Sequence, residues 1–139
     1  MQQISCGTLV VNSARQLLLC HVTGTASWDI PKGLQDAGET PLQSARRELF
    51  EEAGLDFDAD RFEDLGEFTY RPNKQLHLFK VEVGDELCSL DHLRCTSFFP
   101  HQRTGAPTPE ADGFRWAARE ELSSLCWPRM ASRLLSMEW

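Results

Sequence analysis

One strongly marked helix constrains the fold of this chain more than any other feature of its sequence. Thr40 is a typical N-cap residue, Pro41 suits the first helical position, and Gln43 completes a capping box with Thr40. Gly54 ends the pattern, because glycine readily adopts the left-handed conformation that closes many helices. Between these signals, apolar residues recur every three or four positions and form one stripe: Leu42, Ala45, Leu49 and Ala53. The sequence therefore predicts an amphipathic helix over residues 41–53 that packs on a core.

Short apolar runs on both sides of this helix read as strands. They cover residues 3–11, 16–22, 65–70, 76–83, 93–99 and 114–117, and the polar segment between the first two predicts a β-hairpin. The polar, proline-rich interval 100–109 predicts a mobile surface loop, while 120–125 and 129–137 are short helical candidates. Strands that alternate with an early helix and end in further helices predict the mixed α/β class. With 139 residues and no internal boundary, we expect one domain over residues 1–139.

Clustered carboxylates are the second feature of the helix. Four glutamates lie in it or just before it: Glu39, Glu48, Glu51 and Glu52. The last three occupy one arc about 100° wide beside the apolar stripe, where like charges repel one another. Hard divalent cations such as Mg²⁺ and Mn²⁺ prefer clustered carboxylate oxygens. On these residues alone, a metal site and a solvated acidic helix face both stay open.

Composition limits the other classes. No apolar run is long enough to span a bilayer, and the first residues carry neither a basic region nor a long apolar region, so we expect a cytoplasmic protein without a membrane partner. The five cysteines are scattered and read as reduced thiols. A zinc set can be written from Cys88, His92, Cys95 and His101, but its spacing matches no common structural zinc pattern, so unligated side chains are favoured.

The segment around the helix resembles a known family motif. Gly33 is followed by Glu39 after five residues, and seven residues later the chain reads Arg-Glu-Leu-Phe-Glu-Glu-Ala-Gly-Leu over residues 47–55. This pattern resembles the Nudix box, Gly-x5-Glu-x7-Arg-Glu-U-x-Glu-Glu-x-Gly-U with U aliphatic, and agrees with it at every defined position. The resemblance covers residues 33–55. It implies the Nudix fold, an α/β/α arrangement with a mixed β-sheet sandwiched between helices, and a pyrophosphohydrolase that acts on acid anhydrides.

The resemblance also implies roles within the box. Glu48, Glu51 and Glu52 would hold Mg²⁺ or Mn²⁺, and the backbone carbonyl of Lys32 would be a further ligand. Bound cations would withdraw charge from the pyrophosphate and lower the pKa of an attacking water. In addition, the salt bridge between Glu39 and Arg47 would fix the loop against the helix.

The general base is a separate question, because members of the family find it in different places. A box glutamate, Glu51 or Glu52, is favoured here. Glu110, on a late loop, is the alternative catalytic candidate, and an exposed loop acid is the other reading of that residue.

Substrate choice lies outside the box. The segment from Trp28 to Gly33 resembles the Trp-x-x-Pro-Lys-Gly approach seen in dinucleoside polyphosphate and diphosphoinositol polyphosphate hydrolases. The candidate substrate contacts are Trp28, Lys32, Tyr70, Arg71 and Lys74. We therefore expect hydrolysis of a dinucleoside polyphosphate such as diadenosine tetraphosphate. The alternatives are a pyrophosphatase for nucleoside triphosphates or oxidised nucleotides and, in a different class, a non-catalytic Nudix ligand-binding sensor.

The charge distribution bears on the partner. Nine acidic residues and one basic residue lie in 48–67, so this stretch has a charge of −8. The rest of the chain has a charge of +1, which gives the net charge of −7. Divalent cations at the helix would offset this charge, so the expected partner is a small-molecule nucleotide or polyphosphate that binds poorly without metal. No stable complex with nucleic acid is expected, because the chain is acidic. The sequence leaves open whether the chain is a monomer or a homodimer.

Overall fold

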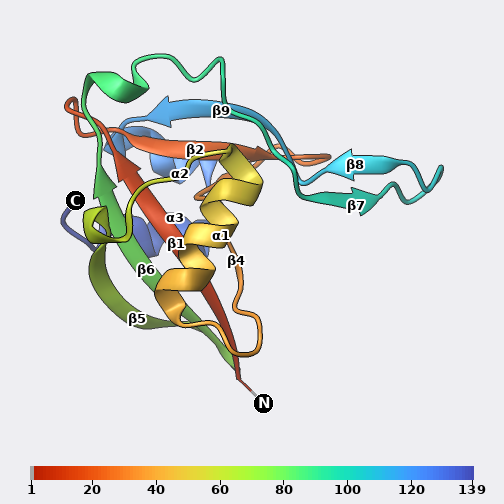
Figure 1. The fold of residues 1–139 in the computed structure, drawn as a ribbon, viewed down its shortest axis with the longest axis horizontal. Coiled ribbons are helices and arrows are strands. Elements are labelled where there is room, and N and C mark those ends of the chain that lie inside the picture. The colour runs from red at the N-terminus through yellow and green to blue at the C-terminus, as the bar shows by residue number, and fades with distance from the viewer. Residues whose placement is uncertain (1) are drawn as a thin grey trace.

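A central β-sheet with helices on both faces organises the chain in a computed structural model that describes residues 2–139 (Figure 1). The strands of the large sheet are β1 (Gln3–Val11), β2 (Leu17–Val22), β3 (Trp28–Asp29), β4 (Lys32–Leu34), β5 (Glu63–Arg71), β6 (Lys74–Glu82) and β9 (Ala111–Ala117). The helices are α1 (Pro41–Ala53), α2 (Leu122–Leu125) and α3 (Pro128–Leu135), with short 3-10 turns at Ala59–Arg61, Asp85–Leu87 and Arg119–Glu121. A separate pair consists of β7 (Phe98–Pro100) and β8 (Pro107–Pro109).

The sheet is mixed and forms the middle of three layers. Its order is β3-β2-β1-β6-β5, with β4 on β1 and β9 on β2, and β1 runs parallel to β6 while the other pairs are antiparallel. Alternating residues of β1 enter different cores: Leu9 and Val11 pack with α2 and α3, whereas Val10 packs with Leu49 of α1. Figure 1 shows α1 on one face and α2 and α3 on the other. The α/β/α prediction is confirmed.

The helix signals act as the sequence predicts. Thr40 accepts a hydrogen bond from the Gln43 backbone at 3.1 Å, and the Gln43 side chain accepts one from the Thr40 backbone at 2.9 Å. Gly54 adopts φ 74° and its N–H donates to the Phe50 carbonyl at 2.8 Å. Of the predicted stripe, Ala45, Leu49 and Ala53 are fully buried and Leu42 packs at the edge of the core. These caps determine where the glutamates of α1 lie.

The expected hairpin of residues 3–11 and 16–22 exists only at its turn. β1 and β2 are antiparallel but pair only at Val11 and Leu17. Beyond this pair, β1 hydrogen-bonds to β6 and β4, while β2 hydrogen-bonds to β9 and β3. The strands diverge because each finds a longer partner elsewhere in the sheet.

Two predictions between residues 93 and 109 need correction. Residues 93–97 form no strand, because their backbone closes the end of α1: the Arg94 N–H donates to Ala53 at 3.2 Å and the Thr96 N–H donates to Glu51 at 2.6 Å. The surface loop expected at 100–109 is shorter: residues 101–106 are exposed and lie outside any strand, and they join β7 to β8 in a hairpin that projects from the body in Figure 1. Prolines are tolerated there because the hairpin is only two strands wide, so each strand keeps an edge without ladder bonds.

The remaining predicted elements are present with longer or shifted bounds. Predicted strands 65–70, 76–83 and 114–117 correspond to β5, β6 and β9. The first two meet in a tight turn in which Asn73 has φ 63°. Helical candidates 120–125 and 129–137 correspond to α2 and α3. The β5–β6 turn and α3 matter below because they border a large cleft.

Candidate active site

Two carboxylates of α1 are buried, although they are the type of side chain that water normally solvates. Glu48 is 8% exposed and Glu52 is 9% exposed. Burial raises the pKa of Glu52, and with the neighbouring Glu48 charge it brings that pKa to about 10, while Lys32 opposes the shift. Burial also raises the pKa of Glu48, against the lowering effect of Arg47. In both cases burial outweighs the neighbouring cation, so both carboxyl groups are protonated more readily than an exposed glutamate.

Arg47 connects the loop before α1 to the glutamates on it. Its Nε and Nη2 donate to the two carboxylate oxygens of Glu39 at 2.7 and 3.0 Å, and Nη1 donates to Glu48 at 2.7 Å and Glu51 at 3.1 Å. Nη2 also donates to the Leu34 carbonyl at 3.0 Å. The Arg47 hydrogen bonds lower the pKa of Glu39 to about 2. Glu39 and Arg47 thus form a bidentate salt bridge, and the Glu51 carboxylate also contacts Arg47.

Gly33 lies directly against the Glu48 carboxyl group. A Cβ built at Gly33 would lie 2.2 Å from the Glu48 carboxyl carbon, which is shorter than any van der Waals contact. Glycine at this position therefore leaves the space that the carboxyl group occupies.

The donor set fits a divalent cation in its chemistry but does not present a finished coordination shell. Glu48 and Glu52 supply buried carboxylate oxygens, which suit a hard cation. Within residues 2–139, no three His, Cys, Asp or Glu side chains already converge on one ion position. Glu51 would have to exchange its contact with Arg47 to join the other two.

Glu52 and Glu110 line the same pocket, which has a volume of about 350 Å³. The two acids lie close enough for the Glu110 charge to raise the pKa of Glu52 further. Lys32 lines the same pocket, with its Nζ 3.2 Å from the Asp29 carboxylate. Although burial acts to lower the pKa of Lys32, Asp29 outweighs it, and the pKa is raised. The pocket therefore brings together a buried acid, an exposed acid and a buried ion pair.

A larger cleft of about 1010 Å³ adjoins this pocket. It is lined by four of the five predicted substrate contacts: Lys32, Tyr70, Arg71 and Lys74. Trp28 lines neither space, because its ring packs edge-on against His21 and lies near the Arg115 guanidinium. Asp29, Lys32 and Trp127 line both spaces, so the two are neighbours that share these residues.

Sequence reasoning missed part of the cleft. Arg129 and Arg133 of α3 line it, as does Trp127 just before that helix. Their only signal in the sequence is the four-residue spacing of the two arginines, which places them on one face of a helix. Nothing local reveals that this face meets the β5–β6 turn.

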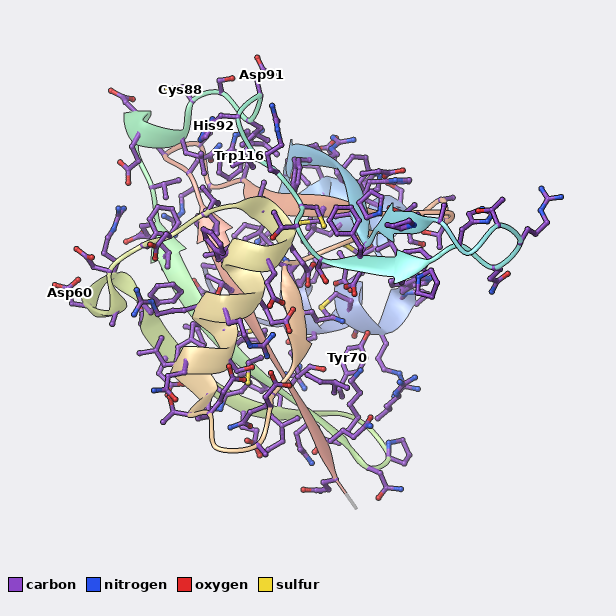
Figure 2. All side chains as sticks on the ribbon, turned by 45° about the vertical axis from the view of Figure 1, so that its right-hand side comes forward. Asp60, Tyr70, Cys88, Asp91, His92 and Trp116 are labelled. Carbon is purple, nitrogen blue, oxygen red and sulfur yellow. The ribbon has the colours of Figure 1, made fainter. Side chains whose placement is uncertain are left out.

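The residues of the alternative zinc set have separate surroundings. Figure 2 shows Cys88 and His92 on the loop after β6, at the opposite end of the view from Tyr70. Cys95 donates to the Ser97 carbonyl at 3.3 Å, and His101 accepts from the backbone of Arg103 at 3.2 Å in the β7–β8 hairpin. Cys95 also accepts a hydrogen bond from the Ala111 N–H at 3.5 Å.

Fold and site together define a class: a small α/β/α domain in which one helix carries buried glutamates beside a cleft rich in basic side chains. Comparison with known proteins identifies the family, because a NUDIX domain model matches residues 1–135. The chain belongs to the Nudix family, a family of pyrophosphohydrolases whose members generally use divalent metals, and the prediction of an enzyme of that class is confirmed at this level.

Individual relatives span most of the chain. An uncharacterized 17.7 kDa protein of Enterobacteria phage T4 is 32% identical, over 94% of this chain and 91% of its own length. An RNA pyrophosphohydrolase of Photobacterium profundum is 32% identical, over 81% of this chain and 67% of its own length. Among solved structures, a C. elegans Ap4A hydrolase matches with a TM-score of 0.63 at 18% identity, over 95% of both chains. At that identity the structural likeness shows the fold alone.

Membrane-spanning helices are a separate matter. No helix within residues 2–139 is both long and apolar enough to cross a membrane.

Proposed function

We propose that this protein is a metal-dependent hydrolase that cleaves the pyrophosphate linkage of a dinucleoside polyphosphate such as diadenosine tetraphosphate. The observation that carries the proposal is that two spaces adjoin: the pocket at Glu52 shares Lys32 with a cleft that Arg71 and Lys74 also line. A polyphosphate chain has the charge to follow such a path. The Ap4A hydrolase among the structural neighbours has the same fold.

Each acidic residue has a role in this proposal. Glu48 and Glu52, joined by Glu51 once it leaves Arg47, would hold Mg²⁺ or Mn²⁺, with the Lys32 carbonyl as a further ligand. When bound, the metal would withdraw charge from the phosphates and lower the pKa of a bound water. Glu39 and Arg47 hold the loop after β4 against α1, and β4 carries Lys32 and Gly33.

The proton acceptor is assigned to a box glutamate, Glu51 or Glu52, with Glu110 as the alternative. Glu52 and Glu110 line the same pocket, so either could receive a proton from water bound there. The Lys32 side chain, although paired with Asp29, remains a donor for a phosphate oxygen because an ammonium carries three N–H bonds.

A second candidate substrate is RNA with a 5′-pyrophosphate or triphosphate end. It is favoured by the relatives named RNA pyrophosphohydrolase, which are 30–32% identical over most of this chain. Against it stands the net charge of −7, which weakens binding to a nucleic-acid backbone. Cleavage of nucleoside triphosphates or oxidised nucleotides and a non-catalytic sensor role are the remaining alternatives.

A cytoplasmic location accompanies the proposal. All five cysteines are free, and unpaired thiols are typical of reducing compartments.

A substrate panel tests the proposal. Purified protein is incubated with Mg²⁺ or Mn²⁺ and diadenosine tetraphosphate, nucleoside triphosphates, nucleotide sugars, diphosphoinositols or 5′-triphosphorylated RNA, and product release is measured. The highest kcat/KM is expected for diadenosine tetraphosphate. A higher value for the RNA would transfer the proposal to the second candidate, and tight binding without any release would support the sensor.

A further inference from the structure

The cleft between the β5–β6 turn and α3 gathers positive charge that the protein itself does not neutralise. Arg71 and Lys74 flank the turn, and Arg129 and Arg133 project from α3. Within residues 2–139, none of these four side chains forms an ion pair with a carboxylate. In a chain with 21 acidic and 14 basic residues, four unpaired cations in one cleft indicate a missing anion.

Contacts with β5 hold the two arginines of α3 in place without pairing them with a carboxylate. Arg129 Nη1 donates to the Tyr70 carbonyl at 2.9 Å, and the Arg133 guanidinium lies over the Phe68 ring at 4.5 Å. A guanidinium has five N–H donors, so most of them remain available to a ligand. The two arginines are thus positioned before any ligand arrives.

The cations are also close enough to act on one another. Burial lowers the pKa of Lys74, and the charges of Lys32 and Arg71 lower it further. Such mutual repulsion costs free energy in the empty protein and is relieved when an anion binds.

The cleft adjoins the pocket that contains Glu52. Asp29, Lys32 and Trp127 line both spaces. A phosphate chain that extends from Glu52 past Lys32 would therefore reach the cations of the cleft.

We propose that Arg129 and Arg133, together with Arg71 and Lys74, form a second anion subsite, which binds phosphate groups of the substrate beyond the linkage that is cleaved. Guanidinium groups suit this task because their paired N–H donors match two phosphate oxygens. The inference rests on the proposed function for the position of the cleaved linkage. It names the substrate class as a small molecule whose phosphate chain continues past that linkage.

Direct binding tests the subsite without catalysis. Calorimetry measures inorganic tripolyphosphate binding in the presence of EDTA to the wild type and to Arg129→Gln/Arg133→Gln. The double variant is expected to bind about tenfold or more weakly, since each arginine supplies charge-assisted hydrogen bonds. The variant Arg129→Lys/Arg133→Lys keeps the charge and should retain most of the affinity.

A matched control carries the same change in net charge. Arg15 and Arg103 are exposed and line neither the cleft nor the pocket, so Arg15→Gln/Arg103→Gln should bind tripolyphosphate like the wild type. Thermal unfolding verifies that each variant is folded. An unchanged affinity in Arg129→Gln/Arg133→Gln would overturn the subsite, as would an equal loss in the lysine variant or in the control.

Steady-state kinetics with Mg²⁺ then connect the subsite to the reaction. The glutamine double variant should raise KM for diadenosine tetraphosphate by about tenfold and leave kcat near the wild-type value, because the subsite binds ground and transition states alike. If hydrolysis of 5′-triphosphorylated RNA suffers while diadenosine tetraphosphate does not, the small-molecule assignment is wrong. If the wild type hydrolyses nothing in the panel, the proposed function fails, whereas the tripolyphosphate measurement still decides the subsite.

Discussion

At the scale of single residues, the carboxyl group of Glu52 is buried and little solvated by water. Its pKa of about 10 arises from burial and from the adjacent Glu48. An ionised carboxylate at this buried position is unfavourable in the apo protein. Its position is instead suited to a divalent cation, which would repay the cost of burying the charge.

Replacement of this carboxyl group separates catalysis from folding. We expect Glu52→Gln to reduce metal-dependent hydrolysis by about 10²–10⁴-fold or more, the range for loss of a group that transfers a proton or holds the metal. The unfolding midpoint without metal should stay near the wild-type value, because glutamine keeps the shape of the side chain. The matched control is Glu120→Gln, at an exposed position outside both spaces. Near-wild-type turnover in Glu52→Gln would contradict the assignment.

Gly33 allows a second test at this scale. Because an added Cβ would lie 2.2 Å from the Glu48 carboxyl carbon, Gly33→Ala should push that carboxyl group away. The expected result is a Mg²⁺ affinity about tenfold lower, measured by calorimetry, with little loss of stability since the displaced atoms end a flexible side chain. The neighbouring Leu34→Ala, at a side chain 46% exposed, controls for general disturbance of the loop. Equal Mg²⁺ affinity in Gly33→Ala and the wild type would show that Glu48 is not a ligand.

Which residues the sequence reveals depends on how far apart they lie along the chain. The geometry of one capped helix fixes the spacing of Glu48, Glu51 and Glu52, so their common arc could be predicted. The approach of Arg129 to Tyr70 joins residues 59 positions apart and depends on tertiary structure. Local pattern therefore predicts the glutamates but not the arginines that α3 brings to the cleft.

At the scale of elements, α1 is held at both ends by neighbouring segments. At its start, Arg47 ties the Glu39 loop to the helix through a pair of hydrogen bonds. At its end, residues 94 and 96 donate to the carbonyls of Ala53 and Glu51. The contacts at the helix end explain why a strand was wrongly predicted at 93–97. The apolar pattern suited a strand, but the N–H groups of this segment donate instead to the last carbonyls of α1, which have no partner within the helix.

The Glu39–Arg47 contact makes stability depend on pH. The folded pKa of Glu39 is about 2, below its ordinary 4.5, so ionised Glu39 stabilises the fold above pH 4.5 and loses this effect as the pH falls toward 2. Glu39→Gln should therefore lower the free energy of unfolding by about 1 kcal/mol at pH 7, and by progressively less toward pH 2. Urea denaturation at pH 7, 4 and 2.5 measures the difference. A loss that is independent of pH would show that the carboxylate charge is not responsible.

At the scale of the whole molecule, the net charge of −7 conceals two regions of opposite sign. The acidic stretch 48–67 includes the glutamates of α1, while the unpaired cations lie across the pocket on the β5–β6 turn and α3. The sequence predicted the first region because its charges are consecutive. Of the second it predicted only Arg71 and Lys74, because the arginines of α3 join them through tertiary structure.

This arrangement predicts how chelation changes substrate affinity. With EDTA, no cation links the carboxyl groups of α1 to the phosphates near Glu52. Binding of diadenosine tetraphosphate should therefore be about tenfold or more weaker with EDTA than with Ca²⁺, which binds oxygen ligands and here replaces Mg²⁺ to slow turnover. The remaining binding should come from the cleft and should fall as salt is raised from 50 to 500 mM, roughly the range over which exposed charges become screened. Equal affinity with and without chelator would contradict a metal between glutamates and phosphates. The four cations attract phosphate through their charge. If the affinity that remains with EDTA does not change with salt concentration, the cleft does not bind phosphate electrostatically.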